Sequence, residues 1–110
     1  MNDDHYAIQA IDEHEARRLV LSGEIDLAIQ GVLLDTFSKE LKGPAKRLIV
    51  DLSNVTFLDS TGINALLSGH KEAEAAGKQF VIVPGPEHVM HSLKVTGVDA
   101  VLDLTGRISA

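Results

Sequence analysis

Hydrophobic and polar positions follow two different periods along this chain, and each period predicts a type of element. Residues 6–11 alternate and residues 18–22 are rich in branched side chains, so both segments are predicted strands, with 12–16 as a hairpin loop. Residues 27–41 place hydrophobic side chains three and four positions apart, which predicts a helix. Asp26 is well placed to cap that helix, and Gly43-Pro44 is a strong stop signal after it.

The second half of the chain repeats this change of period. Residues 47–52 and 79–83 are almost continuously hydrophobic, as in strands that lie in the middle of a sheet covered by helices. Residues 53–56 are expected to form a loop, and a helix with Gly77 as its C-cap is expected after Ser60.

A short helix and a last strand are expected near the C-terminus. Pro86 suits the first position of a helix that Gly97 would end. A short strand is expected within residues 98–104, followed by a tail at 105–110. The hydrophobic side chains expected on the buried side of the short helix are Val89, Met90, Leu93 and Val95.

The predicted order of elements is β-β-α-β-α-β-α-β. Strands joined through a helix should run parallel with right-handed crossovers, and the first hairpin should be antiparallel. The fold class is therefore α/β, with an N-terminal hairpin in a mixed β-sheet and helices packed against it. The 110 residues are enough for one compact domain and too few for two.

Composition and charge narrow the classes of function. The chain has 45% hydrophobic and 24% charged residues and no cysteine, which is typical of a globular domain in a reducing cytoplasm and excludes disulfides. No hydrophobic run approaches the roughly 18–20 residues of a membrane span, and the acidic N-terminus lacks the order of a secretory signal. A net charge of −6 disfavours direct nucleic-acid binding. One basic cluster is interpreted as a solvated helix end and turn, and it consists of Lys39, Lys42, Lys46 and Arg47.

The segment Phe57-Leu58-Asp59-Ser60-Thr61-Gly62 is the main candidate for function. It precedes a helical pattern, so two hydroxyls and a carboxylate are expected at a helix N-terminus. Such an end has spare N–H donors and a partial positive charge, which suit a phosphate, and Gly62 would leave room for close approach. Helix capping alone would also explain why Asp59 or Ser60 is at this position. The residues by themselves therefore do not decide whether Ser60 is a phosphorylation site or a helix cap.

Enzyme, cofactor and metal motifs are missing from the sequence. No phosphate-binding loop, dinucleotide-binding glycine motif or hydrolase nucleophile elbow is present, so no cofactor and no catalytic activity are expected. His88 and His91 lie three positions apart without further ligands nearby, so no metal site is expected either. Asp51 ends a predicted buried strand, as does the phosphoacceptor of a response-regulator receiver, but the acidic pair and the lysine that such a receiver needs are not in place.

At these residues the chain resembles a known family. Residues 48–53 and 57–63 resemble the core of the STAS-domain anti-sigma factor antagonists. Residues 19–26 are similar to the Gly-Glu-Leu/Ile-Asp segment of that family, 77–83 to its third-strand region, and 93–99 to its helix-to-last-strand turn. The resemblance covers nearly the whole chain in the same order and implies a single STAS domain at residues 1–110. Family members often have a longer C-terminal helix than the last six residues here would allow.

The resemblance implies a partner-switching module. In that family the first serine of the motif is phosphorylated by an ATP-dependent serine kinase that is also the anti-sigma factor, and a PP2C-type phosphatase restores it. The matching residue here is Ser60. The unphosphorylated antagonist binds the anti-sigma factor and frees the sigma factor, and a free antagonist is expected to be a monomer. The implied partner-binding residues are Gly23, Glu24, Asp26, Asp59, Ser60, Thr61 and Gly62.

The sequence is also compatible with three other functions. The chain could be the STAS subunit of an ABC-type lipid-transport complex, in which the same loop regulates docking to the ATPase or permease. It could be a stand-alone STAS sensor or scaffold whose Ser60 is never phosphorylated. The last alternative is a small nucleotide-binding protein that uses the same helix N-terminus.

Overall fold

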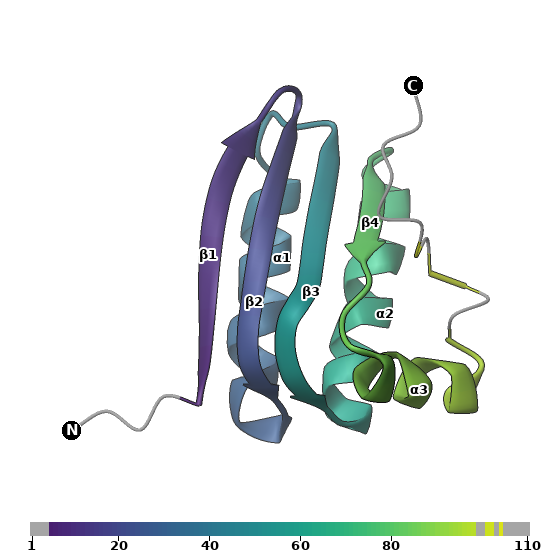
Figure 1. Cartoon of the computed structure of the whole chain (residues 1–110). Helices are drawn as coiled ribbons and strands as arrows, with labels where there is room; N and C mark the ends of the chain where they lie inside the picture. The colour runs from purple at the N-terminus through teal and green to yellow at the C-terminus, as the bar shows by residue number, and fades with distance from the viewer. Residues whose placement is uncertain (1–4, 99–100, 103, 105–110) are drawn as a thin grey trace.

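In the part of the chain that the structure describes, a four-stranded mixed sheet carries helices on one face (Figure 1). The computed structural model describes residues 5–98, 101–102 and 104. The strand order is β1-β2-β3-β4, with β1 antiparallel to β2 and with β3 parallel to both of its neighbours. The elements are β1 (Tyr6–Glu13), β2 (Ala16–Ile25), the short 3-10 helix η1 (Leu27–Ile29), α1 (Gln30–Leu41), β3 (Arg47–Leu58), α2 (Ser60–Ala75), β4 (Gln79–Val83) and α3 (Glu87–Thr96).

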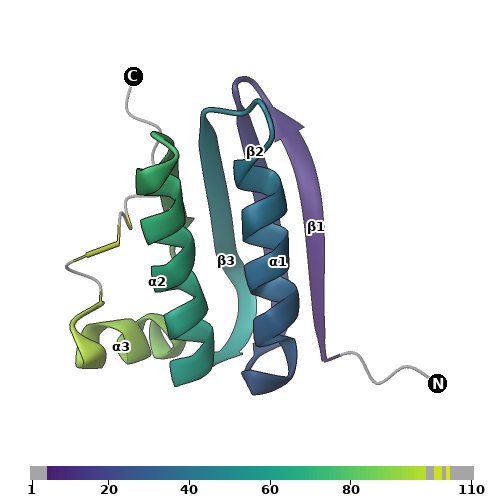
Figure 2. The same ribbon diagram turned by 180° about the vertical axis from the view of Figure 1, so that it is seen from behind.

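The helices α1 and α2 lie side by side on the same face of the sheet, and α3 lies at the end where β3 finishes (Figures 1 and 2). Leu19, Val50 and Ile82 project from the strands toward this face and are fully buried. Phe37 of α1 meets Phe80 of β4 edge to face, with ring centroids 5.4 Å apart. One hydrophobic core therefore fixes both helices on the sheet, and the expected α/β class is confirmed.

The first hairpin is tighter than the sequence suggested. The expected loop at 12–16 was wrong at both ends, because Asp12 and Glu13 belong to β1 and only two residues form the turn. Glu15 in that turn has φ 59°, the left-handed region that two-residue turns use. Cross-strand ion pairs explain why these polar residues are in strands, since Arg17 binds Asp12 at 2.6 Å and Arg18 binds Glu13 at 2.7 Å.

The loop expected at 53–56 was also wrong, because β3 runs without a break from Arg47 to Leu58. Its second half continues to pair with β2, after register shifts between Val20 and Ser22 and between Gly23 and Glu24. Val55 and Leu58 enter the core, while Ser53, Asn54, Thr56 and Phe57 stay exposed. The longer strand carries the candidate segment to the far end of the sheet.

The C-terminal elements agree with the sequence in part. α3 is present, and Gly97 ends it with φ 76°. Val95 was wrongly assigned to its buried side, since 70% of its surface is exposed. Residues 98, 101, 102 and 104 are not in a strand, and the rest of the expected last strand and the tail at 105–110 lie outside the described residues.

Candidate functional site

The two segments that the sequence singled out meet at one end of the sheet. β2 and β3 are paired there, with Glu24 opposite Phe57 and Ile25 opposite Leu58. The Asp59 N–H donates to the Ile25 carbonyl oxygen at 3.2 Å, which continues the pairing into the loop. The Gly-Glu-Ile-Asp segment and the start of α2 therefore form one continuous surface.

Asp59 is the N-cap of α2, and its carboxylate uses the helix donors. Its Oδ1 accepts hydrogen bonds from the backbone N–H of Thr61 at 3.0 Å and of Gly62 at 3.1 Å. The Thr61 hydroxyl also donates to it, at 2.6 Å. The expectation that this helix end has spare donors for a phosphate is therefore wrong for these two N–H groups, because Asp59 already occupies them.

The same hydrogen bonds keep Asp59 ionised. Burial of the carboxyl raises its pKa, but the hydrogen bonds from Thr61 and from the backbone N–H of Gly62 outweigh burial and hold the pKa below its usual range. A fixed negative charge therefore lies directly before Ser60 at neutral pH.

Ser60 is accessible and is not needed for the fold. It is the first residue of α2, it is exposed, and its hydroxyl has no hydrogen-bond partner among the described residues. Thr61 differs on both points, since it is only half-exposed and its hydroxyl is held by Asp59. Capping explains Asp59 and Thr61, but it does not explain the hydroxyl of Ser60.

The two glycines of the site shape its backbone. A Cβ on Gly62 would lie 2.6 Å from Leu58 Cδ1 and 2.9 Å from Ile25 Cγ2, so the lack of a side chain lets α2 start directly against β2. Gly23 has φ 83°, and a Cβ there would lie 2.0 Å from the His5 carbonyl oxygen. Gly62 is buried, so its observed contacts are with the protein's own core.

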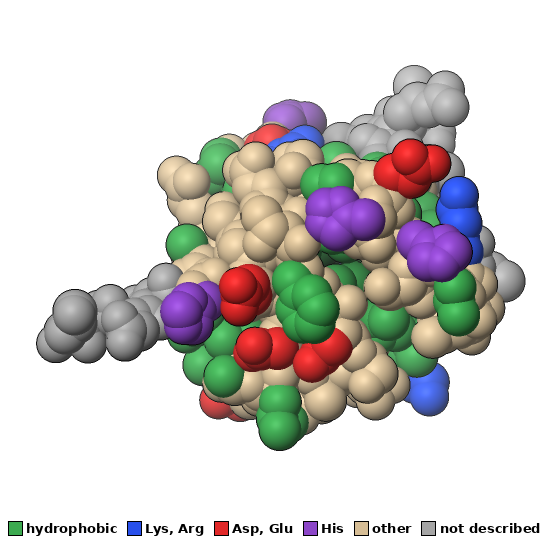
Figure 3. Space-filling view, turned by 60° about the horizontal axis from the view of Figure 1, so that its bottom comes forward, with side chains coloured by type: hydrophobic (Ala, Val, Ile, Leu, Met, Phe, Trp, Pro, Cys, Tyr) green, Lys and Arg blue, Asp and Glu red, His purple; other side chains and the backbone are tan. Residues whose placement is uncertain are grey.

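Glu24 and Asp26 complete the acidic part of this surface. Glu24 is exposed, and the Asp26 carboxylate caps η1 by accepting from the Ala28 N–H at 3.0 Å. The predicted capping role of Asp26 is thus confirmed. Figure 3 shows this end of the molecule, with acidic side chains gathered around exposed hydrophobic ones.

Leu27 and Phe57, the exposed hydrophobic residues of this face, were not predicted from the sequence to have a binding role. Leu27, directly after Asp26, is 68% exposed, and Phe57, directly before Leu58, is 48% exposed. A sequence signal existed, because both flank the polar motifs and neither fits the core side of its element. Exposed large hydrophobic side chains beside a polar rim are typical of protein-binding surfaces.

A cavity of about 380 Å³ lies between Ser60 and α3. Its walls come from the end of β3, the start of α2 and the outer side of α3. Nothing in the sequence patterns placed α3 beside the serine. The lining residues are Leu58, Asp59, Ser60, Ile63, His91, Ser92, Val95 and Thr96.

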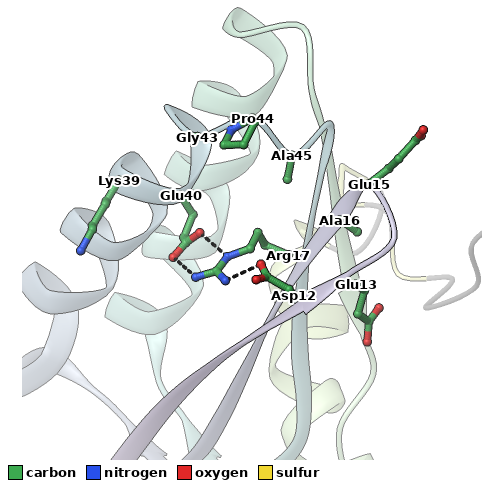
Figure 4. Close-up of a pocket in the computed structure, with 10 residues that line it drawn as sticks. All are labelled: Asp12, Glu13, Glu15, Ala16, Arg17, Lys39, Glu40, Gly43, Pro44 and Ala45. Carbon is green, nitrogen blue, oxygen red and sulfur yellow. Dashed lines mark hydrogen bonds and ion pairs between the residues drawn. The ribbon is translucent and has the colours of Figure 1, made fainter.

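A second cavity, of about 510 Å³, lies beside the β1–β2 turn and the end of α1 (Figure 4). At its centre the Arg17 guanidinium binds both carboxylate oxygens of Glu40, at 2.8 and 3.0 Å, and also binds Asp12. The hydrogen bonds that Arg17 donates to Glu40 raise the pKa of Arg17 and lower the pKa of Glu40. Because the central charges satisfy one another, this cavity is a structural clamp between hairpin and helix.

Asp51 does not have the setting of a receiver phosphoacceptor. It lies in the middle of β3, where the Arg18 guanidinium binds it at 3.0 Å and the Ser53 N–H donates to it at 2.9 Å. Burial raises its pKa, but these hydrogen bonds lower it further than burial raises it. Its carboxylate is therefore part of a structural ion pair on the sheet.

The chain is similar to known proteins both in sequence and in structure. The sequence model of a family described as Mlab, STAS domain, matches residues 9–106. An anti-sigma factor antagonist from Mycobacterium paratuberculosis is similar in structure, with a TM-score of 0.83 and 23% identity over 94% of this chain and 87% of that chain. The anti-sigma factor antagonist SpoIIAA in its unphosphorylated form gives a TM-score of 0.76 and 20% identity, over 90% of this chain and 89% of that one.

The Bacillus cell fate determinant SpoIIAA in its phosphorylated form is also similar, with a TM-score of 0.68 and 20% identity over 90% of this chain and 92% of that chain. At these identities the likeness concerns the fold. In the part of the chain that the structure describes, no helix is long and hydrophobic enough to cross a membrane.

Proposed function

The chain belongs to the STAS domain family, and from this premise we propose that it is an anti-sigma factor antagonist switched by phosphorylation of Ser60. In its unphosphorylated form it binds an anti-sigma factor that is also a serine kinase, and so releases a sigma factor. A PP2C-type phosphatase removes the phosphate and restores binding. The chain is a substrate of these enzymes and has no catalytic role of its own, and it acts in the cytoplasm as a monomer when free.

The observation that carries this proposal is the environment of Ser60. Its hydroxyl is exposed, unlike that of Thr61, and it makes no hydrogen bond within the described residues that modification would break. It also lies on the face where Leu27 and Phe57 are exposed, so a phosphate there would sit inside the docking surface. The docking surface consists of Gly23, Glu24, Asp26, Leu27, Phe57, Asp59, Ser60 and Thr61, with Gly62 supporting it from beneath.

Electrostatics explains how the phosphate would release the partner. Phosphoserine adds about −1.5 to −2 charges. Asp59 is already ionised and occupies two helix donors, so the new charge is repelled locally and remains on the surface. A loss of roughly 2–3 kcal/mol at the interface weakens binding about 30–150-fold. Release then needs no refolding, which agrees with the similarity of this fold to SpoIIAA in both forms.

Phosphorylation by candidate anti-sigma kinases tests the proposal directly. The chain is incubated with each kinase and ATP, and the modified residue is identified by mass spectrometry. We expect one phosphate on Ser60, none on the Ser60→Ala variant, and unchanged incorporation in the matched Thr61→Ser control. Phosphate on residue 61 alone, or none with any candidate kinase, would contradict the assignment.

A second candidate follows from the family description, which names Mlab and no antagonist. In this case the chain is the STAS subunit of a lipid-transport complex, and the same surface docks to an ATPase or permease. Affinity capture from the native cells separates the two, because the antagonist should retain a serine kinase and the transport subunit an ABC-type ATPase. A Ser60→Asp variant should lose the kinase in the first case.

A further inference from the structure

His91 of α3 lines the same cavity as Ser60, and it has no part in the switch proposed above. The cavity of about 380 Å³ separates the serine from the α3 residues His91, Ser92, Val95 and Thr96. His91 is exposed, and its ring makes no hydrogen bond to the described residues. Thr96 is different, since its hydroxyl donates to carbonyls of its own helix at 3.0 and 3.1 Å.

The position of α3 is fixed independently of His91. Val89 and Leu93 anchor the helix, with relative exposures of 1% and 0%. One turn before His91, the Nε2 of His88 lies 2.8 Å from the carbonyl oxygen of Thr56 in β3. His91 therefore projects from a helix that is already attached to the strand leading into Ser60.

Asp59 is the one titratable side chain in the cavity lining besides His91. Asp59 contributes a negative charge on the Ser60 side, and its carboxylate has taken the N–H groups of Thr61 and Gly62. A phosphate on Ser60 must therefore find other donors. Glu87, His88 and Lys94 are the other titratable groups on α3, and the cavity lining contains none of them.

We propose that His91 donates a hydrogen bond to the phosphate of phosphorylated Ser60, with Ser92 as a second donor, and so couples α3 to the switch. This rests on the proposed phosphorylation of Ser60. The imidazole ring carries an N–H in both protonation states and two when charged, so it suits a phosphate across a small cavity. The bound phosphate holds α3 more firmly against α2. Phosphorylation thereby stabilises α3 as well as changing the charge of the docking surface.

The test uses the full chain with phosphoserine installed at residue 60 during synthesis, so it does not depend on any kinase. Phosphorus NMR follows the second ionisation of the phosphate, whose midpoint is normally near about pH 6. In the native sequence we expect this midpoint to fall by roughly 0.3–1 pH unit relative to the His91→Ala variant, because a hydrogen bond donated by the His91 ring favours the dianion. Amide exchange across 87–96 should also slow on phosphorylation, and it should not slow in His91→Ala.

Lys94→Ala is the matched control, since Lys94 lies on α3 and outside the cavity lining. It should keep the native midpoint. An equal midpoint in the native and His91→Ala chains, or a shift caused by Lys94→Ala instead, would overturn the role of His91. A failure of kinases to modify Ser60 would count against the proposed function and would leave this measurement unchanged.

Discussion

Asp59 and Ser60 are neighbours with opposite tasks. Asp59 is tied to α2 by three hydrogen bonds to its Oδ1, while the Ser60 hydroxyl has no partner among the described residues. The fold therefore depends on the carboxylate, and the serine is available for chemistry. The sequence does not show which of the two residues caps the helix, because Asp and Ser both have suitable side chains for capping.

Replacing Asp59 by Ala should destabilise the protein by about 0.5–2 kcal/mol at neutral pH, through loss of the cap. The pKa of Asp59 is lower in the folded state than in the unfolded chain, so this stabilisation is complete above the usual aspartate pKa of about 4 and is lost as the pH falls through the folded value. Urea denaturation at pH 7, 5 and 3 measures the difference from the native chain. Ser60→Ala is the control and should change stability little. A difference that grows below pH 4 would contradict the capping role.

At the scale of elements, the site depends on how closely α2 approaches β2. Gly62 lies at the point of contact, with Ile25 on one side and Leu58 on the other. This contact fixes the first turn of α2 and thus the direction in which Ser60 points. The sequence suggested that Gly62 made room for a ligand, and the structure shows that the room is filled by the protein's own side chains.

Gly62→Ala should destabilise the fold by roughly 1–3 kcal/mol, because the added methyl overlaps Leu58 Cδ1 and Ile25 Cγ2. Gly31→Ala is a matched control within α1, since a Cβ there meets nothing within 4 Å. The control should be neutral or more stable by up to about 1 kcal/mol. Chemical denaturation of both variants measures the effects, and equal stability of the two would show that the contact at Gly62 can relax.

At the scale of the whole molecule, the two ends of the sheet differ in whether their charged side chains form ion pairs or face the solvent. At the hairpin end, Arg17 is paired with Asp12 and Glu40. At the Ser60 end, Glu24 is exposed. Acidic side chains gather around exposed hydrophobic ones at this end (Figure 3). This second end is therefore suited to a partner with a basic rim and a hydrophobic centre.

Glu24→Lys should slow association with the proposed anti-sigma partner by about 3–30-fold at low salt, because steering by complementary charge is lost. Glu15→Lys changes the net charge equally but lies in the turn at the other end, next to the clamp cavity. That control should keep the native rate. Stopped-flow or surface plasmon resonance at several salt concentrations gives the rates, and equal slowing by both variants would show that only net charge matters.

Local patterns recovered most elements but not their ends. The strand at 79–83 and the helices α1, α2 and α3 were predicted from the spacing of hydrophobic residues and from stop signals such as Gly97. Residues 53–56 were predicted as a loop because polar residues dominate the segment, yet Asn54 and Val55 pair with Ser22 and Gly23 of β2. Strand pairing between distant segments is not a local property, so sequence pattern alone could not supply it.

Residue types and their order along the whole chain were enough for the α/β class, the STAS family and the position of Ser60 at the start of a helix. The caps formed by Asp26 and Asp59 are local, because each carboxylate accepts from N–H groups two or three positions ahead. The tertiary structure was needed to show that Gly62 packs on Ile25 and that His91 and Val95 line the same cavity as the serine. These contacts depend on where α3 and β2 lie relative to α2, and that placement is set by packing of the whole core.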